Sequence, residues 1–107
     1  MIRVRVVIHR AAEQDILDQA SCYRDQGAPS GGIRFAAAVS RAVSAVAEMP
    51  HAGTPRTSSN PRLDGLRSWP ICGFREMNVY YLVARQELTI IRVLHDKRDR
   101  KSTRLNS

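Results

Sequence analysis

The residues best suited to chemistry lie near the end of the chain, where basic side chains accompany a histidine. Arg92 falls in the last predicted strand, and His95, Lys97 and Arg98 follow at its end. A histidine titrates near neutrality and suits proton transfer, whereas arginine and lysine hold phosphate oxygens. If the protein is a nuclease, we expect its catalytic residues to be His95, Arg92 and Arg98.

Neighbouring strands would add further arginines to this basic face. Such a face could bind the phosphates of a nucleic acid, or it could accept an acidic segment of another protein. The structural alternative is that these arginines only lie on a solvent-exposed face of the sheet, and that the histidine only makes a hydrogen bond at the strand end. The residues predicted to bind a target or phosphate are Arg67, Arg75, Arg92, Lys97 and Arg98.

Other kinds of site have little support in the sequence. His9, His51 and His95 are far apart, and no cysteine or histidine pair has the spacing of metal ligands. Gly31 and Gly32 open a predicted helix without a preceding strand, so they do not form a phosphate-binding loop. We therefore expect neither a metal nor a cofactor.

The net charge of +7 is the strongest feature of the composition. Lys97 and Lys101 are the only lysines among the 17 basic residues, so arginine dominates. The excess lies in the second half of the chain and is consistent with a nucleic acid or an acidic protein as partner. A GC-rich genome, which favours arginine and alanine, is an equally good explanation.

The chain length of 107 residues is typical of one domain with its own core. No apolar run is long enough to cross a membrane, and the first residues do not resemble a signal peptide. Cys22 and Cys72 are the only cysteines. Two isolated thiols without an export signal favour the reducing cytoplasm.

The last nine residues differ from the rest in having neither periodicity nor a turn pattern. They can be encoded by a DNA string that resembles a common short-read sequencing adapter. Segments of that origin are excluded from reasoning about the fold. We therefore expect a single domain over residues 1–98 and a non-native tail over residues 99–107.

Hydrophobic periodicity predicts one strand and two helices in the first half. Residues 2–8 alternate, with Ile2, Val4 and Val6 on one face, which predicts a half-buried strand. Apolar residues at helical spacing predict helices over residues 10–25 and 30–47, which form an antiparallel hairpin. The predicted apolar positions are Ala12, Ile16, Leu17, Ala20 and Tyr23 in the first helix, and Ile33, Phe35, Val39, Ala42, Val43 and Val46 in the second.

The second half is predicted to hold a loop and three strands. Residues 49–65 have no period and are rich in turn-forming residues. Strands are expected over residues 66–71, 75–83 and 88–95, with Ile91 and Val93 on one face of the last strand and Arg92 on the other. Tyr80 and Tyr81 are adjacent, so only one should face the core. The fold class is α+β: an antiparallel sheet, in the order β-α-α-β-β-β, with the helical hairpin on one face.

Three segments, in this order, carry a resemblance to a known family. Glu48 to Arg56 resembles the loop after the helical hairpin of ParE toxins. The segment Gly65 to Pro70, with Gly73-Phe74 and Val79-Tyr80-Tyr81, resembles their central strands. Ile90 to Asp99 resembles their final strand and its His-x-x-Arg-Asp ending. The resemblance covers residues 2–99 and is to the ParE/RelE superfamily, closer to ParE.

This resemblance implies a toxin of a type II toxin–antitoxin pair, held in a hetero-oligomer by its cognate antitoxin. ParE-like members act on DNA gyrase without an active site in the usual sense, whereas RelE-like members cut mRNA on the ribosome. The scarcity of lysine and the lack of a glutamate base beside His95 favour gyrase. The alternatives are a RelE-like endonuclease and an inactive module that binds antitoxin. ParE-like chains continue beyond the Arg-Asp ending, which is the point where the tail begins here.

Overall fold

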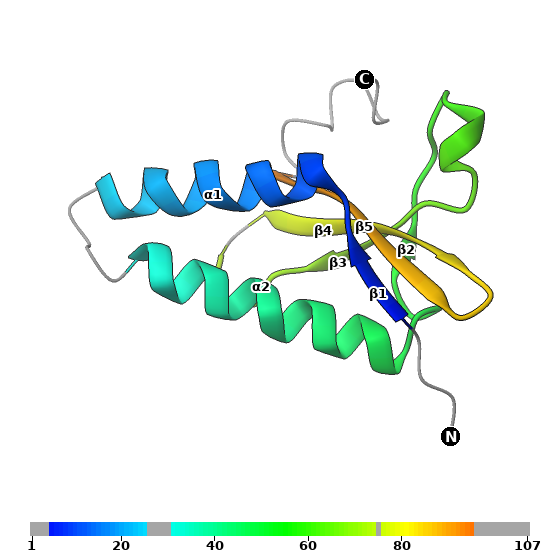
Figure 1. The fold of residues 1–107 in the computed structure, drawn as a ribbon, viewed down its shortest axis with the longest axis horizontal. Helices are drawn as coiled ribbons and strands as arrows, with labels where there is room; N and C mark the ends of the chain where they lie inside the picture. Colours follow the sequence, from blue (N-terminus) through cyan, green and yellow to red (C-terminus); the bar gives the residue numbers. More distant parts are fainter. Residues whose placement is uncertain (1–4, 26–30, 75, 96–107) are drawn as a thin grey trace.

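The computed structural model describes residues 5–25, 31–74 and 76–95, which form one sheet and two long helices (Figure 1). The expected boundary at residue 98 and the tail 99–107 lie outside the described residues. The elements in chain order are β1 (Arg5–Ile8), α1 (Arg10–Asp25), α2 (Gly31–Glu48), β2 (Thr54–Pro55), the short 3-10 helix η1 (Pro61–Leu63), β3 (Arg67–Pro70), β4 (Met77–Ala84) and β5 (Glu87–His95).

The sheet has five strands in the order β1-β5-β4-β3-β2. β2 to β5 are antiparallel to their neighbours, as expected, but β1 runs parallel to β5, with Arg5 opposite Glu87 and Ile8 opposite Ile90. The prediction of a wholly antiparallel sheet was therefore wrong for β1. β1 and β5 are joined through both helices and the three strands β2 to β4, so the connection is much longer than a parallel pair requires.

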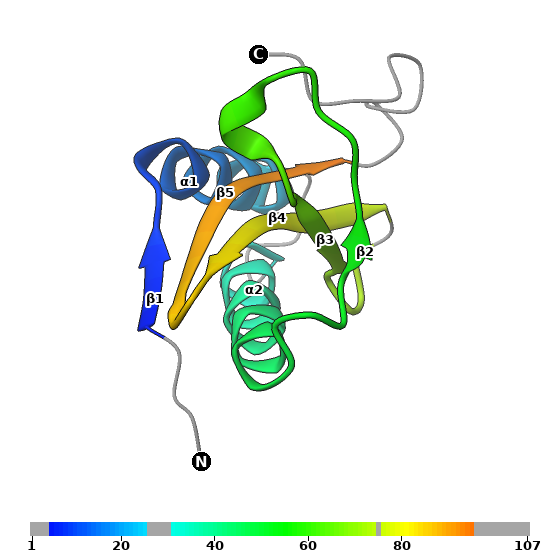
Figure 2. The same ribbon diagram turned by 90° about the vertical axis from the view of Figure 1, so that its right-hand side faces the viewer.

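Both helices pack against the sheet, α1 along β5 and α2 beneath β3 and β4 (Figure 2). Successive turns of α2 bury Phe35, Val39, Ala42 and Val46, which confirms most of its predicted apolar stripe. Ile33 is the exception, since 75% of it is exposed. It lies in the first turn of α2.

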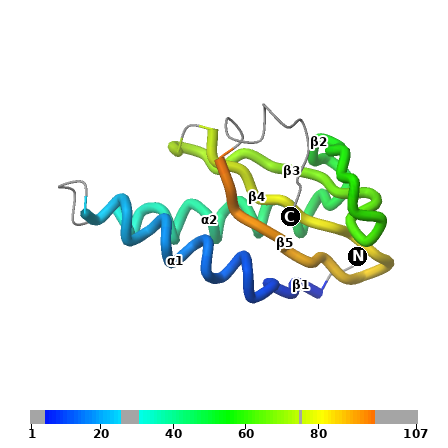
Figure 3. Tube along the Cα trace, turned by 90° about the horizontal axis from the view of Figure 1, so that it is seen from above, coloured from blue at the N-terminus to red at the C-terminus, as the bar shows by residue number. Residues whose placement is uncertain are grey.

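The two helices run side by side along the molecule (Figure 3). Glycine allows their close approach, because a Cβ on Gly32 would lie 2.8 Å from the carbonyl oxygen of Ala20. Tyr23, Phe35 and Phe74 pack their rings at centroid distances of 5.0–5.2 Å, which joins both helices to the turn after β3. Leu17, predicted as apolar core, is exposed on the outer side of α1. Among the described helices, none is long and apolar enough to span a membrane.

The pairing of β4 with β5 contains an irregularity that changes which residues face the core. Tyr80 pairs with Arg92 while the next residue, Tyr81, pairs with Ile90, so Ile91 is an extra residue of β5. Such a bulge shifts the alternation of the strand by one position. Ile90 and Val93 are therefore both buried in the core, and the predicted pairing of Ile91 with Val93 on one face was wrong.

The segment between α2 and β3 is more ordered than its sequence indicated. It contains the two-residue strand β2 and η1, which Asn60 caps by accepting a hydrogen bond from the backbone N–H of Arg62. Arg56 N–H donates to the Leu66 carbonyl oxygen at 2.8 Å, and β2 pairs with β3 at Thr54 and Ser68. The segment therefore forms the edge of the sheet opposite β1.

Candidate functional site

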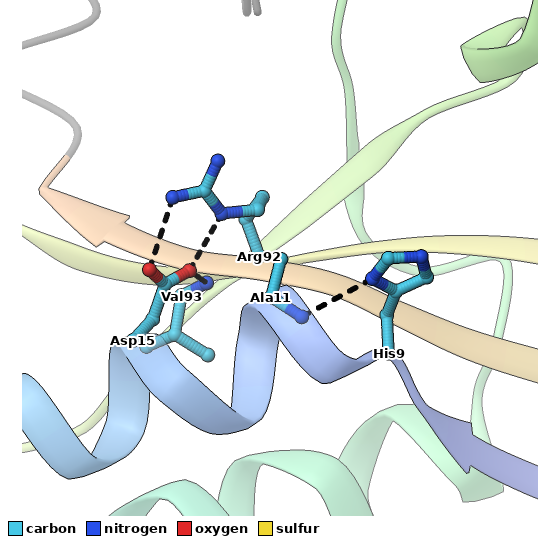
Figure 4. Close-up of polar contacts among 5 residues, drawn as sticks. All are labelled: His9, Ala11, Asp15, Arg92 and Val93. Carbon is cyan, nitrogen blue, oxygen red and sulfur yellow. Dashed lines mark hydrogen bonds and ion pairs between the residues drawn. The ribbon is translucent and has the colours of Figure 1, made fainter.

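Arg92, the central basic residue of the predicted site, is engaged with a carboxylate of α1 (Figure 4). Its Nε and Nη2 donate to the two carboxylate oxygens of Asp15 at 2.7 and 3.0 Å. The backbone N–H of Val93 donates to the same carboxylate at 3.0 Å. The side chain of Asp15 is 13% exposed and that of Arg92 39%. A bidentate pair of this type is among the stronger polar contacts in proteins.

The end of β1 explains why Asp15 reaches this position. His9 N–H donates to the Ile90 carbonyl oxygen, which completes the parallel pairing, and the chain then turns into α1. The imidazole Nδ1 of His9 accepts the N–H of Ala11 at 3.2 Å and so caps the first turn. Beyond Ile90, no strand of the described part of the chain lies beside β5 on this edge. Asp15 lies against that edge and accepts the Val93 N–H, whose hydrogen bond would otherwise be lost.

Arg92 belongs to a row of residues that crosses three strands on the face away from the core cluster. Ser68, Tyr80 and Arg92 are direct neighbours in the register of β3, β4 and β5. Tyr80 is buried although it lies outside the core cluster, because Arg56 covers it with its guanidinium 5.7 Å from the ring centroid. The Nε of Arg56 donates to Ser68 Oγ at 2.8 Å. Tyr81 faces the core and Tyr80 the opposite face, but both are buried.

Arg67 lies on the other face of the sheet, the face that Tyr81 shares with the helices. Its Nη1 donates to the Gly53 carbonyl oxygen at 2.8 Å. The Tyr81 hydroxyl donates to the Pro50 carbonyl oxygen at 3.0 Å. Burial raises the pKa of Tyr81, and a backbone hydrogen bond with Gly53 and the charge of Arg67 partly offset that rise. The hydrogen bonds of Arg67 and Tyr81 therefore hold the loop after α2 against β3 and β4.

His95 ends β5 opposite Met77, a core residue of β4. It is half-buried, and three positions separate it from Arg92 beyond the bulge, so the two side chains leave the strand on opposite faces. Arg67 is opposite Tyr81, four residues along β4 from the partner of His95, which is roughly 13 Å at the rise of a strand. Arg67, Arg92 and His95 are therefore not brought together. Arg75, Lys97 and Arg98 lie outside the described residues.

Sequence reasoning missed Asp15, which engages Arg92, and the role of Arg56, which covers Tyr80 and donates to Ser68. Arg56 was predicted only as the end of the loop after the helical hairpin. No local signal pairs Asp15 with Arg92, which lie 77 positions apart. The sequence also does not indicate that Gly53 contacts Tyr81. In the structure, a Cβ on Gly53 would collide with the Tyr81 hydroxyl and the Ser68 carbonyl oxygen.

Among the described residues, the groups predicted for chemistry do not converge on one point. General acid–base catalysis needs donor and acceptor groups converging on one reacting atom. Arg92 and Arg67 instead make contacts within the fold, and His95 points away from Arg92. Within residues 5–25, 31–74 and 76–95, no three histidine, cysteine, aspartate or glutamate side chains gather as metal ligands.

Comparison with known proteins agrees with this architecture. The family described as "ParE toxin of type II toxin-antitoxin system, parDE" matches residues 6–100. A comparison with curated proteins found no match. Among solved structures, a chain from the "Chromosomal ParDE TA system from P. aeruginosa" is similar with a TM-score of 0.70 and 17% identity, over 87% of this chain and 96% of that one. At that identity the likeness concerns the fold, whereas the family match covers most of the sequence. The chain therefore belongs to the ParE toxin family of type II toxin–antitoxin systems.

Proposed function

We propose that this ParE-family protein arrests growth by binding DNA gyrase in the cytoplasm, and that a cognate antitoxin neutralises it in a hetero-oligomer. The family match over residues 6–100 carries the proposal. Family membership supports a toxin, and the geometry of the sheet favours action by binding over cleavage. The RelE-like nuclease gains no specific support from the positions of the described residues.

The hydrogen bonds that Arg67 and Arg92 make within the fold favour binding over cleavage. A phosphate clamp needs guanidinium groups that are free to receive an incoming oxyanion. The guanidinium of Arg92 already holds two carboxylate oxygens, and that of Arg67 holds the Gly53 carbonyl. We therefore assign contact with the target to the remaining predicted basic residues, Arg75, Lys97 and Arg98. Arg67 and Arg92 would act by maintaining the fold.

A test in cells separates the two mechanisms. The protein would be induced, and chromosomal DNA breaks and cut transcripts would be scored in the same culture. We expect DNA breaks while transcripts stay intact. The double variant Arg92→Ala and His95→Ala should still break DNA if it folds. Cut transcripts that disappear in this variant, with DNA intact, would replace the gyrase proposal with a ribonuclease.

The charge assignment has its own control. Replacing Lys97 and Arg98 by glutamine should reduce growth inhibition without lowering the melting temperature. Replacing the exposed Arg41 of α2 by glutamine removes one charge elsewhere and should leave inhibition unchanged. Equal inhibition by all variants would show that the basic end does not contact the target.

A further inference from the structure

β1 ends the sheet and exposes apolar side chains on both of its faces. All four of its residues are exposed, including Val6 at 38%, Val7 at 36% and Ile8 at 40%. The sequence predicted a half-buried strand, and for the described part of β1 that prediction was wrong. A valine- and isoleucine-rich edge strand in water is usually covered or protected by charge, because it invites pairing with another chain.

The backbone of β1 has an outer side that pairs with no described residue. Arg5 and His9 donate their N–H groups to Gln86 and Ile90 of the β4–β5 hairpin. In a parallel pair, alternate residues turn their N–H and C=O groups toward the neighbouring strand. Val7 therefore faces β5, whereas Val6 and Ile8 direct both backbone groups outward. We call this outer side, with the side chains of Val6, Val7 and Ile8, the β1 edge.

Positive charge surrounds the β1 edge. Arg5 begins the strand, Arg10 begins α1 just beyond it, and Arg85 in the β4–β5 turn is exposed beside Arg5. Arg5 and Arg85 line a shallow hollow of about 340 Å³ together with Glu87. Glu87, opposite Arg5, and Glu13, in the first turn of α1, offset part of this charge.

This charge argues against a second copy of the chain as occupant. If two β1 edges paired antiparallel about Val7, Arg5 of one copy would lie opposite His9 of the other, close to its Arg10. Like charges opposite each other destabilise a strand pair. An extended segment with carboxylates at its ends would meet the arginines with the opposite charge, and its apolar side chains would cover Val6, Val7 and Ile8.

We propose that the β1 edge receives an extended segment of another protein, in which apolar residues alternate and acidic residues flank them. The segment adds a sixth strand beside β1. The assignment of this segment to the antitoxin rests on the proposed function, but the recognition itself does not.

Binding of a designed peptide tests the proposal directly. The probe is a capped, fluorescent peptide of alternating valine and threonine with two glutamates at each end, and its counterpart carries lysines instead. Fluorescence polarisation should show binding of the acidic peptide and at least tenfold weaker binding of the basic one. Equal binding of the two peptides, or no binding of either, would overturn the proposal.

Two variants locate the bound peptide. Val6→Pro removes an outward N–H, leaves the bonds to β5 in place, and should weaken binding about tenfold. Arg10→Glu should also weaken it, whereas Arg62→Glu should not, because η1 connects β2 and β3 at the other end of the strand order from β1. If Val6→Pro does not fold, the comparison of Arg10→Glu with Arg62→Glu decides alone. Wild-type affinity in Arg10→Glu would place the peptide elsewhere and contradict the proposal.

Sedimentation tests the rival occupant. A concentration-dependent dimer that Val6→Pro abolishes would assign the β1 edge to a second copy and overturn the acidic partner. The binding result is independent of toxicity. A chain that binds the acidic peptide but does not arrest growth would refute the proposed function alone, and a chain that arrests growth without binding would refute only this inference.

Discussion

The exposed edge of β1 and the adjoining edge of β5 beyond Ile90 differ in whether their outward backbone groups have hydrogen-bond partners. Beyond Ile90, the edge of β5 that faces away from β4 is paired with no described strand, but Asp15 of α1 accepts the Val93 N–H there and binds Arg92. β1 pairs with the first part of β5. No described residue lies on its outer side, and it exposes three apolar residues. The fold therefore satisfies the edge of β5 with its own carboxylate, whereas the β1 edge has no described partner and is the surface proposed to bind another protein.

Proline substitutions in β1 should give the largest effect on stability, and the loss should depend on whether the removed N–H faces β5 or points outward. Val7→Pro removes an N–H that faces β5 and should lower the free energy of unfolding by about 3 kcal/mol. Val6→Pro removes an outward N–H and should cost less than about 1 kcal/mol. Urea denaturation followed by circular dichroism measures both. Equal losses would show that the assumed alternation of β1 is wrong.

The closed edge depends on Asp15. Asp15→Ala leaves the Val93 N–H and the Arg92 guanidinium without their acceptor, and should cost about 2 kcal/mol. In a domain of this size that corresponds to a fall in Tm of roughly 10 °C. Scanning calorimetry would measure it, with Asp18→Ala on the exposed side of α1 as control. A change in Tm no larger than that of the control would mean that Asp15 does not hold the edge.

Arg92→Ala should have a smaller effect than Asp15→Ala. The carboxylate of Asp15 keeps the Val93 N–H, and the arginine side chain is 39% exposed, so solvent screens the pair. We expect a loss of about 1 kcal/mol in the free energy of unfolding. A double-mutant cycle with Asp15→Ala isolates the pairwise part. A larger loss for Arg92 than for Asp15 would reverse the roles assigned here.

On the helix-covered face of the central strand β4, Tyr81 predicts a pH dependence of stability. Its pKa is raised in the folded protein, mainly by burial, so the unfolded chain loses the phenolic proton first as the pH rises. The stability from this group is complete below the unfolded value of about 10 and declines at higher pH. Tyr81→Phe should remove that part of the decline and cost about 1 kcal/mol at neutral pH through loss of the bond to Pro50. An unchanged alkaline decline in Tyr81→Phe would assign it to other groups.

Much of the fold followed from local patterns, and most of the site did not. The helix over residues 10–25 was predicted to its boundaries because its apolar spacing is a local signal. The bulge at Ile91 depends on pairing with β4, and the parallel pairing of β1 with β5 joins strands that are far apart in the sequence. The partner of Arg92 is set by the packing of α1 on β5, which no spacing in the sequence encodes.

The residues chosen for chemistry illustrate the same limit. Arg92 and His95 are close in sequence and were predicted to act in one site. Strand alternation after the bulge places their side chains on opposite faces of the sheet. Arg67 was placed on a basic face, but it lies on the helix side and holds the Gly53 carbonyl. The overall architecture was predictable because hydrophobic periodicity determines it, whereas a polar side chain takes its partner from tertiary structure.

The most direct test of the central claim uses purified components. Purified gyrase, supercoiled plasmid and ATP would be incubated with increasing amounts of this protein, and DNA cleaved in a gyrase-dependent manner would be quantified. The account predicts cleaved plasmid that increases with the ratio of protein to gyrase and saturates near equal amounts. Intact plasmid at every ratio, together with cut mRNA when the same preparation meets translating ribosomes, would contradict it.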